Sequence, residues 1–187
     1  MAAESTLKNM VLCLSAVCLI CAAVVGVAYA VTKEPIDDAA RAKTTASIAA
    51  VLPEFTGTPE QGSVNVDGTD YTYYKTDSGC AVISSTSGFG GALKLMVGIA
   101  ADGTVHNTTV LSHSETPGLG AKCTTDEHFI GQFQGFDPKQ KSLTVKKDGG
   151  DLDAITASTI TSRAYALAVS NAVKVFNKLN EGGQGNE

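Results

Sequence analysis

The sequence DAITASTITSRAYALAVSNAVKVF, residues 153–176, joins a hydroxyl-rich segment to a segment with apolar residues at helical spacing. This spacing predicts an amphipathic helix from about residue 159 to residue 180. The first N–H groups of a helix have no intrahelical partner, and the helix dipole adds partial positive charge there. A phosphate is therefore expected to bind at the start of this helix without any lysine or arginine. The simpler alternative is that Thr156 or Ser158 only caps the helix.

The rest of the chain contains the signals of short strands separated by tight turns. Ala101-Asp102-Gly103 lies between two apolar runs and predicts a β-hairpin. Short strands with helices at both ends favour an α+β fold of short antiparallel strands with flanking helices. The expected elements are strands at 64–66, 71–75, 81–84, 93–100, 105–111 and 142–145, turns at 67–68 and 77–79, and a helix at 126–133.

The N-terminal region is expected to anchor the chain in a membrane. Residues 10–31 carry no charge, and about 20 apolar residues form a helix that crosses the hydrocarbon layer. A cleaved signal peptide is the alternative, since Ala28-Tyr29-Ala30 fits a cleavage pattern, but the length of the run favours an uncleaved anchor. Flanking positive charges do not settle the orientation. A short stub before a long domain is the usual export arrangement, so residues 33–187 are expected outside the cytoplasm.

These signals divide the chain into five parts. Residues 1–9 are a short cytoplasmic stub and residues 10–31 the transmembrane helix. Residues 32–63 are a juxtamembrane linker and helix, in which a linker at 32–36 contains Pro35 and a helix at 37–52 stops before Pro53. Residues 64–180 form the compact domain, and residues 181–187 form a flexible polar tail.

Composition excludes several classes of function. The net charge is −5 and no basic stripe is present, which argues against nucleic-acid binding. No GxSxG elbow, P-loop or helix-opening GxGxxG occurs, so hydrolase and nucleoside-triphosphate chemistry lack support. The three histidines, His106, His113 and His128, lack the spacing of zinc ligands, and no metal site is expected.

The five cysteines fall into two groups. Cys13, Cys18 and Cys21 lie in the membrane run, where apolar packing is the simpler role and ligation of a cluster with partner cysteines is the alternative. Cys80 and Cys123 lie in the domain expected outside the cytoplasm, where a disulfide between them is possible in chemical terms. The sequence alone leaves their pairing open.

In three separated segments, DAITAST at 153–159, HSETPGLG at 113–120 and GFGGALKLMVG at 88–98, the chain resembles the FMN-binding subunits of Rnf- and Nqr-type redox complexes. The segment Asp153, Thr156, Ala157, Ser158 and Thr159 is similar to the flavin-attachment motif of that family, in which the last threonine carries FMN through a phosphoester bond. Family members more often have Ala where this chain has Ser158, which leaves a second hydroxyl beside the acceptor. The loop at 113–120, HSETPGLG, and the glycine-rich segment at 88–98 also match the family, in the family's order.

The resemblance implies a covalent FMN site in the domain at 64–180. Thr159 is the expected attachment residue, and Asp153 is expected to engage the attaching enzyme or its metal, or else to cap the helix. Glu115 either hydrogen-bonds the flavin or pairs with Lys122. The remaining expected cofactor contacts are Thr116, Gly118, Leu119, Gly120, Thr156, Ser158, Thr161 and Ser162.

The function implied is electron transfer inside a membrane complex. The closer likeness is the G subunit of an Rnf-type ferredoxin:NAD⁺ oxidoreductase coupled to Na⁺ or H⁺ translocation. The alternatives are the longer C subunit of the Na⁺-pumping Nqr NADH:quinone oxidoreductase, a flavin domain of another extracellular electron chain, or a non-redox exported binding module. The expected partners are other membrane and redox subunits, a flavin transferase that uses Mg²⁺ and FAD, and the lipid bilayer. The expected location is the cell (inner) membrane, single-pass, with the FMN domain on the extracytoplasmic side.

Overall fold

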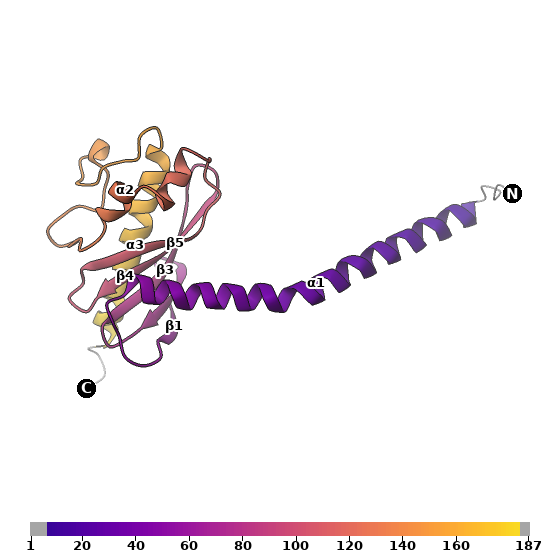
Figure 1. Cartoon of the computed structure of the whole chain (residues 1–187), viewed down its shortest axis with the longest axis horizontal. Helices are drawn as coiled ribbons and strands as arrows, with labels where there is room; N and C mark the ends of the chain where they lie inside the picture. Colours follow the sequence, from indigo (N-terminus) through magenta and orange to yellow (C-terminus); the bar gives the residue numbers. More distant parts are fainter. Residues whose placement is uncertain (1–6, 184–187) are drawn as a thin grey trace. The chain divides into compact units, whose positions relative to one another are not determined.

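The structure is a computed structural model that describes residues 7–183 of the chain. It separates into two compact units, one ending at Lys43 and one beginning at Thr44. The second unit contains a five-stranded antiparallel sheet and two further α-helices (Figure 1). The predicted α+β class with an N-terminal apolar helix is therefore confirmed.

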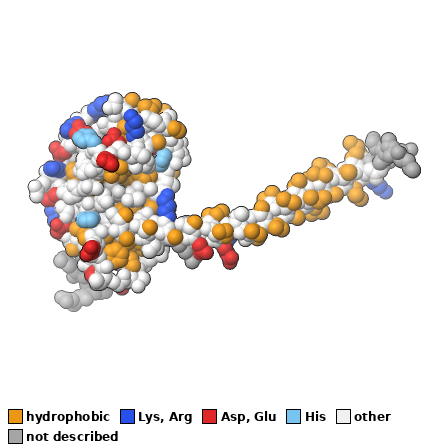
Figure 2. Space-filling view, viewed as in Figure 1, with side chains coloured by type: hydrophobic (Ala, Val, Ile, Leu, Met, Phe, Trp, Pro, Cys, Tyr) orange, Lys and Arg blue, Asp and Glu red, His pale blue; other side chains and the backbone are white. Residues whose placement is uncertain are grey.

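Helix α1 runs without a break from Leu7 to Val51. Of the described helices, it alone contains a segment long and apolar enough to cross a membrane, Leu7–Ile36, with a mean hydropathy of 2.8. Figure 2 shows hydrophobic side chains along this part of the helix. The predicted linker at 32–36 is wrong, because Pro35 lies inside the helix. Proline removes only one backbone donor, and the apolar and alanine-rich segments on its two sides both favour helix.

The sheet is a meander in which each strand pairs with the next along the chain. The longest pairing joins β3 and β4, from Gly79 opposite Ala100 to Ser87 opposite Ala92. The first five predicted strands are confirmed, and the first begins four residues earlier than predicted. The strands are β1 Glu60–Val66, β2 Thr69–Lys75, β3 Gly79–Ser87, β4 Ala92–Ala100 and β5 Val105–Ser112.

Both faces of the sheet are covered, and strand β4 shows how. Leu93, Leu95, Val97 and Ile99 belong to the larger core, which helix α3, Thr159–Gly183, completes. Met96 alternates with them and joins a second core with Ile48, Val51 and Leu52, at the end of α1. Each fully buried aliphatic side chain contributes about 1.5–3 kcal/mol relative to an exposed one. The end of α1 is therefore part of the folded domain.

A long connection between β5 and α3 contains three short helices. They are η1 Gly120–Thr124, α2 Glu127–Gly131 and η2 Lys146–Asp148. Helix α2 lies inside the range predicted as helix, and Asp126 caps it by accepting a hydrogen bond from Phe129 N at 3.1 Å. Phe129 and Phe133 pack against Tyr165 of α3, with ring centroids 5.1 and 4.8 Å from the tyrosine ring. These rings fix the connection to α3.

The predicted strand at 142–145 is wrong. Val145 forms an isolated parallel bridge with Leu152, and Leu152 N donates to Thr144 O at 3.0 Å. These bonds close a local loop instead of adding a strand to the sheet. Gly149, with φ 84°, ends η2 in the left-handed conformation that glycine adopts without strain. The loop carries η2 to the start of α3.

No disulfide joins Cys80 and Cys123, because both thiols are free and buried. Of the predicted flexible tail, residues 181–183 belong to α3, and residues 184–187 lie outside the described part.

Candidate cofactor site

A cavity of about 320 Å³ lies beside the start of α3, within the size range of small-molecule sites. It is lined by residues from all three motifs singled out in the sequence. These residues are Phe89 from the glycine-rich segment, Glu115, Thr116, Leu119 and Gly120 from the loop after β5, and Ala157, Ser158, Thr159, Ile160 and Thr161 from the start of α3. Segments up to 72 positions apart in the sequence thus meet at one site.

The backbone that enters α3 is held by Ser162. Its hydroxyl donates to Ser158 O at 3.0 Å and accepts from Ile155 N at 2.9 Å. Ala157 has φ 62°, a left-handed conformation that is uncommon for a residue with a side chain. Among the described residues, neither the Thr156 nor the Ser158 hydroxyl accepts a hydrogen bond from an N–H group in the first turn of α3. The interpretation of these residues as simple helix caps therefore finds no support. The first N–H groups of α3 remain available to an anion.

Glu115 ties the three motifs together from a buried position, with 5% of its surface exposed. It accepts a hydrogen bond from Thr161 Oγ1 at 2.7 Å and one from Gly90 N at 3.4 Å. A side chain at Gly88 or Gly120 would overlap its carboxylate oxygens. Gly88 and Gly120 therefore leave the space that the Glu115 carboxylate occupies.

The cavity walls carry large apolar side chains that are open to solvent. Phe89 is 68% exposed, Ile160 49% and Leu119 45%. Grouped exposed apolar side chains beside a cavity are typical of a binding surface. Ser158 also lines the cavity, is 7% exposed, and its Oγ takes part in none of the hydrogen bonds of the described residues. The cavity therefore has apolar walls and one hydroxyl group, that of Ser158, without a hydrogen-bond partner among the described residues.

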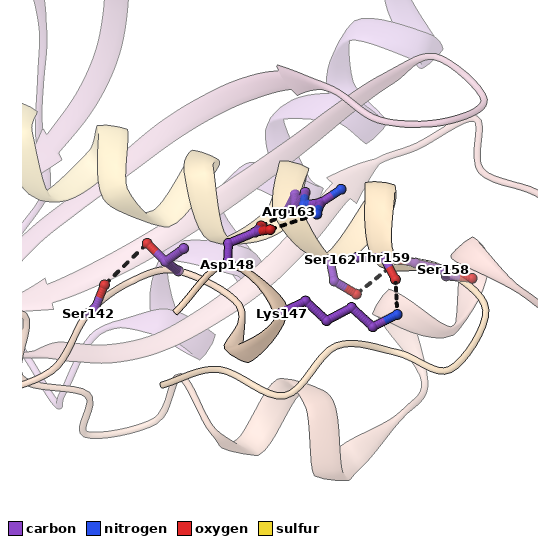
Figure 3. A network of polar contacts seen from close by, with 8 residues as sticks. Ser142, Lys147, Asp148, Ser158, Thr159, Ser162 and Arg163 are labelled. Carbon is purple, nitrogen blue, oxygen red and sulfur yellow. Dashed lines mark hydrogen bonds and ion pairs between the residues drawn. The ribbon is translucent and has the colours of Figure 1, made fainter. Parts of the chain in front are cut away.

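A cation lies at the edge of this site. Lys147 Nζ donates a hydrogen bond to Thr159 Oγ1 over 3.1 Å, as Figure 3 shows. The sequence predicts a phosphate site that needs no lysine or arginine, and the structure adds Lys147 beside it. The loop that replaces the predicted strand at 142–145 carries Lys147 to this position.

Two ion pairs hold the segment around Lys147 in place. Arg163 donates to both carboxylate oxygens of Asp148, at 2.6 and 2.7 Å, and these hydrogen bonds lower the pKa of Asp148 (Figure 3). Lys146 pairs with Asp153 at 2.8 Å. The Asp153 backbone is fixed by Gln132, which both donates to it and accepts from it. The Asp153 side chain thus faces Lys146 and does not cap α3.

The predicted site residues divide into two groups. Glu115 bonds to Thr161 and Gly90, and the described ion pairs do not include one with Lys122. Gly118, Thr156 and Ser162 are not among the cavity-lining residues and stay predictions as cofactor contacts. The predicted residues that do line the cavity are Glu115, Thr116, Leu119, Gly120, Ser158, Thr159 and Thr161.

Sequence reasoning missed four residues at the site. In the sequence, Phe89 stands out only as part of a glycine-rich motif. Ala157 and Ile160 lie inside the attachment segment and were interpreted as backbone and helix core. No sequence pattern places Lys147 near Thr159, because its position depends on how the preceding loop folds.

Comparison with known proteins shows which family the chain belongs to. Residues 88–174 match the family described as FMN-binding domain. Over 181 residues the chain is 32% identical to the G subunit of the ion-translocating oxidoreductase complex of Cereibacter sphaeroides, covering 86% of this chain and 80% of the relative. The chain belongs to this G-subunit family.

Other G subunits match over a shorter region. The Shewanella baltica protein is 47% identical over 94 residues, which cover 48% of this chain and 44% of the relative. The G subunit of the proton-translocating ferredoxin:NAD(+) oxidoreductase complex of Clostridium ljungdahlii is 43% identical over 96 residues, half of each chain. The matched region thus spans about half the length of these relatives. Among solved structures, the C subunit of the Na(+)-translocating NADH-quinone reductase of Parabacteroides distasonis has a TM-score of 0.44 and 19% identity, covering 67% of this chain and 76% of that one.

Proposed function

We propose that this chain is a membrane-anchored FMN carrier in which Thr159 holds the cofactor through a phosphoester bond. The observation that carries the proposal is the cavity at the start of α3, where the residues of three separate motifs meet beside Thr159 Oγ1. Membership of the G-subunit family and the match to the FMN-binding domain support FMN as the occupant.

The residues present fit the two chemically different ends of FMN. The phosphate requires a positive field, which the free N–H groups of α3 and Lys147 supply next to Thr159. The flavin ring requires a flat apolar surface, which Phe89, Leu119 and Ile160 supply. Ser158 contributes a hydroxyl without another partner among the described residues. Glu115 accepts a hydrogen bond from Thr161 and so holds the loop after β5 against α3.

A bound flavin supplies single-electron transfer, and the polypeptide supplies binding, orientation and electrostatics. Thr159 is the acceptor of the flavin phosphate, and a separate flavin transferase attaches it from FAD with Mg²⁺. Thr116, Leu119 and Gly120 of the loop after β5 form one wall of the cavity. Covalent attachment is useful outside the cytoplasm, where lost FMN is not readily replaced.

We place the chain in an Rnf-type complex, as a subunit that relays electrons between membrane and redox partners. The names of its relatives describe subunits of ion-translocating complexes, one of them a proton-translocating ferredoxin:NAD(+) oxidoreductase. The segment Leu7–Ile36 is the proposed lipid-embedded anchor. An extracytoplasmic position of the FMN domain is part of this proposal.

The attachment is tested by expressing the chain with the transferase and weighing it intact. The wild-type chain is expected to be heavier than its polypeptide by one flavin phosphoester, and its denatured band is expected to fluoresce in a gel. Thr159→Val keeps the shape of the side chain but removes the acceptor oxygen, so this variant is expected to be folded, membrane-bound and without covalent flavin.

The matched control is Ser158→Ala, which removes the neighbouring hydroxyl and is expected to keep the flavin. Loss of flavin in Ser158→Ala with retention in Thr159→Val would move the attachment to Ser158. A wild-type chain with the mass of the bare polypeptide would refute the covalent carrier and favour a non-redox binding module.

A further inference from the structure

Lys147 brings a positive charge to the proposed attachment oxygen while its neighbours are already paired. Lys146 pairs with Asp153, and Asp148 pairs with Arg163. Lys147 adds to the field that Arg163 exerts on Asp148, but its hydrogen bond goes to the neutral hydroxyl of Thr159. An anion formed at Thr159 would therefore meet a cation that no carboxylate of the described residues holds in a hydrogen bond.

The position of Lys147 is set by the structure around it. Asp148 N donates to Val145 O and Lys146 N donates to Leu152 O, both at 2.8 Å, so the backbone of η2 is hydrogen-bonded on both sides of Lys147. The bidentate pair of Asp148 with Arg163 attaches η2 directly to the second turn of α3 (Figure 3). These contacts fix the backbone at Lys147, so only its side chain can change conformation.

A second, independent feature points to a ligand at the same place. Ser158, adjacent to Thr159, lines the cavity, is more than nine-tenths buried, and leaves its Oγ without a hydrogen bond among the described residues. Ser84 Oγ is the only fully buried side-chain oxygen without a partner among the described residues, so Ser158 Oγ keeps some contact with solvent. In the cavity, this hydroxyl is free to hydrogen-bond a polar ligand.

We infer that Lys147 is a positioning residue for flavin attachment, an inference that rests on the function proposed above. Its ammonium group holds Thr159 Oγ1 at the mouth of the cavity before the reaction and neutralises the phosphodiester afterwards. This diester carries one negative charge, and Lys147 supplies one positive charge at hydrogen-bond distance from the oxygen that becomes part of it.

The reaction balances with FAD as the flavin donor. Thr159 Oγ1 forms a bond to the phosphorus that carries the flavin, while the bond from that phosphorus to the bridging pyrophosphate oxygen breaks. AMP leaves with the bridging oxygen, and the hydroxyl proton passes to water. No oxidation or reduction occurs. Lys147 donates a hydrogen bond throughout and exchanges no proton.

The test measures attachment to the full-length chain in detergent, purified from cells without the transferase. Purified transferase, Mg²⁺ and FAD are added, and covalent flavin is followed by in-gel fluorescence and intact mass. The variants are Lys147→Met and Lys147→Gln, which remove the charge, and Lys147→Arg, which keeps it. Lys174→Met removes a lysine from the other end of α3, where it pairs with Asp67, and is the matched control.

The neutral variants are expected to lower kcat for attachment about tenfold, the effect of one charged hydrogen bond at an exposed site. The KM for the acceptor chain and the urea midpoint of unfolding are expected to stay the same. Lys147→Arg is expected to recover most of the rate, and Lys174→Met to match the wild type.

Three results would overturn the inference while leaving the proposed function intact. They are a wild-type kcat in both neutral variants, an arginine variant as slow as the neutral ones, or a defect confined to KM, which would indicate docking of the transferase. If the wild-type chain takes up no flavin, or Thr159→Val takes up as much as the wild type, the proposed function fails and this inference fails with it.

Discussion

Ala157 lies two residues before the proposed acceptor and adopts a left-handed backbone, with φ 62°. A residue with a Cβ pays about 1–2 kcal/mol for this conformation, whereas glycine adopts it freely. The flavin-attachment motif that this segment resembles has Gly or Ala at this position, and a left-handed backbone disfavours larger side chains there. Strain of this kind often lies at functional sites, where the surrounding structure enforces it. Here Ser162 enforces it through bonds to Ser158 and Ile155.

Ala157→Gly is therefore expected to stabilise the chain, by up to about 1 kcal/mol after the larger backbone entropy of unfolded glycine is subtracted. Urea unfolding followed by circular dichroism measures the change. Ala157→Val, with a branched side chain at the same φ, is expected to destabilise. Equal stability of the alanine and glycine forms would show that the backbone strain is relieved elsewhere.

At the scale of elements, Gly98 of β4 explains how the end of α1 reaches the sheet. A Cβ at Gly98 would overlap the backbone carbonyl of Val51, so only glycine allows this contact. The contact completes the second core, in which Ile48, Val51 and Leu52 pack on Met96. His106 supports it by a hydrogen bond of 3.0 Å between its Nδ1 and Val51 O.

Gly98→Ala is expected to destabilise the domain by about 1–3 kcal/mol, the usual range for an overpacked core. The matched control is Gly131→Ala in α2, where a Cβ meets nothing within 4 Å and the φ is ordinary. That change is expected to be neutral or slightly stabilising, since alanine favours helix. Comparing the urea midpoints of the two variants tests the prediction, and equal midpoints would contradict the close contact at Gly98.

The elements predicted well from sequence are those whose signals are local. The hairpin at Ala101-Asp102-Gly103 and the start of α3 at Thr159 depend on turn residues and periodicity within a few positions. The errors have non-local or competing causes. The helical segments on both sides of Pro35 outweigh the effect of the proline, and the loop around Val145 closes on Leu152 instead of joining the sheet. The motifs predicted most of the residues that line the cavity but not the apolar side chains of Phe89 and Ile160, and the position of Lys147 required the fold.

At the scale of the whole molecule, three buried acidic groups link folding to pH. Burial raises the pKa of Cys80 and of Cys123 to about 11, and the nearby charge of Glu115 adds to the effect on Cys123. Burial also raises the pKa of Tyr165 to about 12, although its hydroxyl is paired with Thr108 at 2.7 Å. Each group is neutral in the folded chain at a pH where its unfolded form already loses its proton.

Stability is therefore expected to be level near neutral pH and to fall above about pH 9, where the unfolded thiols ionise. Each thiol lowers the free energy of unfolding by up to about 1.4 kcal/mol per pH unit until its folded pKa is reached. Urea midpoints between about pH 7 and pH 10.5 measure the slope. The double variant Cys80→Ala, Cys123→Ala is expected to show a shallower decline, and an identical slope in both proteins would rule out the thiols as its source.

The packing of Ile48, Val51 and Leu52 decides where the protein can be cut. If the chain is cut just after the apolar segment Leu7–Ile36, these side chains stay with the folded domain, and both faces of its sheet stay covered. Division after Pro53 would strip one side, exposing Met96 and its neighbours to water and inviting aggregation. A water-soluble fragment for crystallisation or potentiometry should therefore start no later than Thr44. It then keeps the last two turns of α1, which the sequence alone does not connect to the sheet.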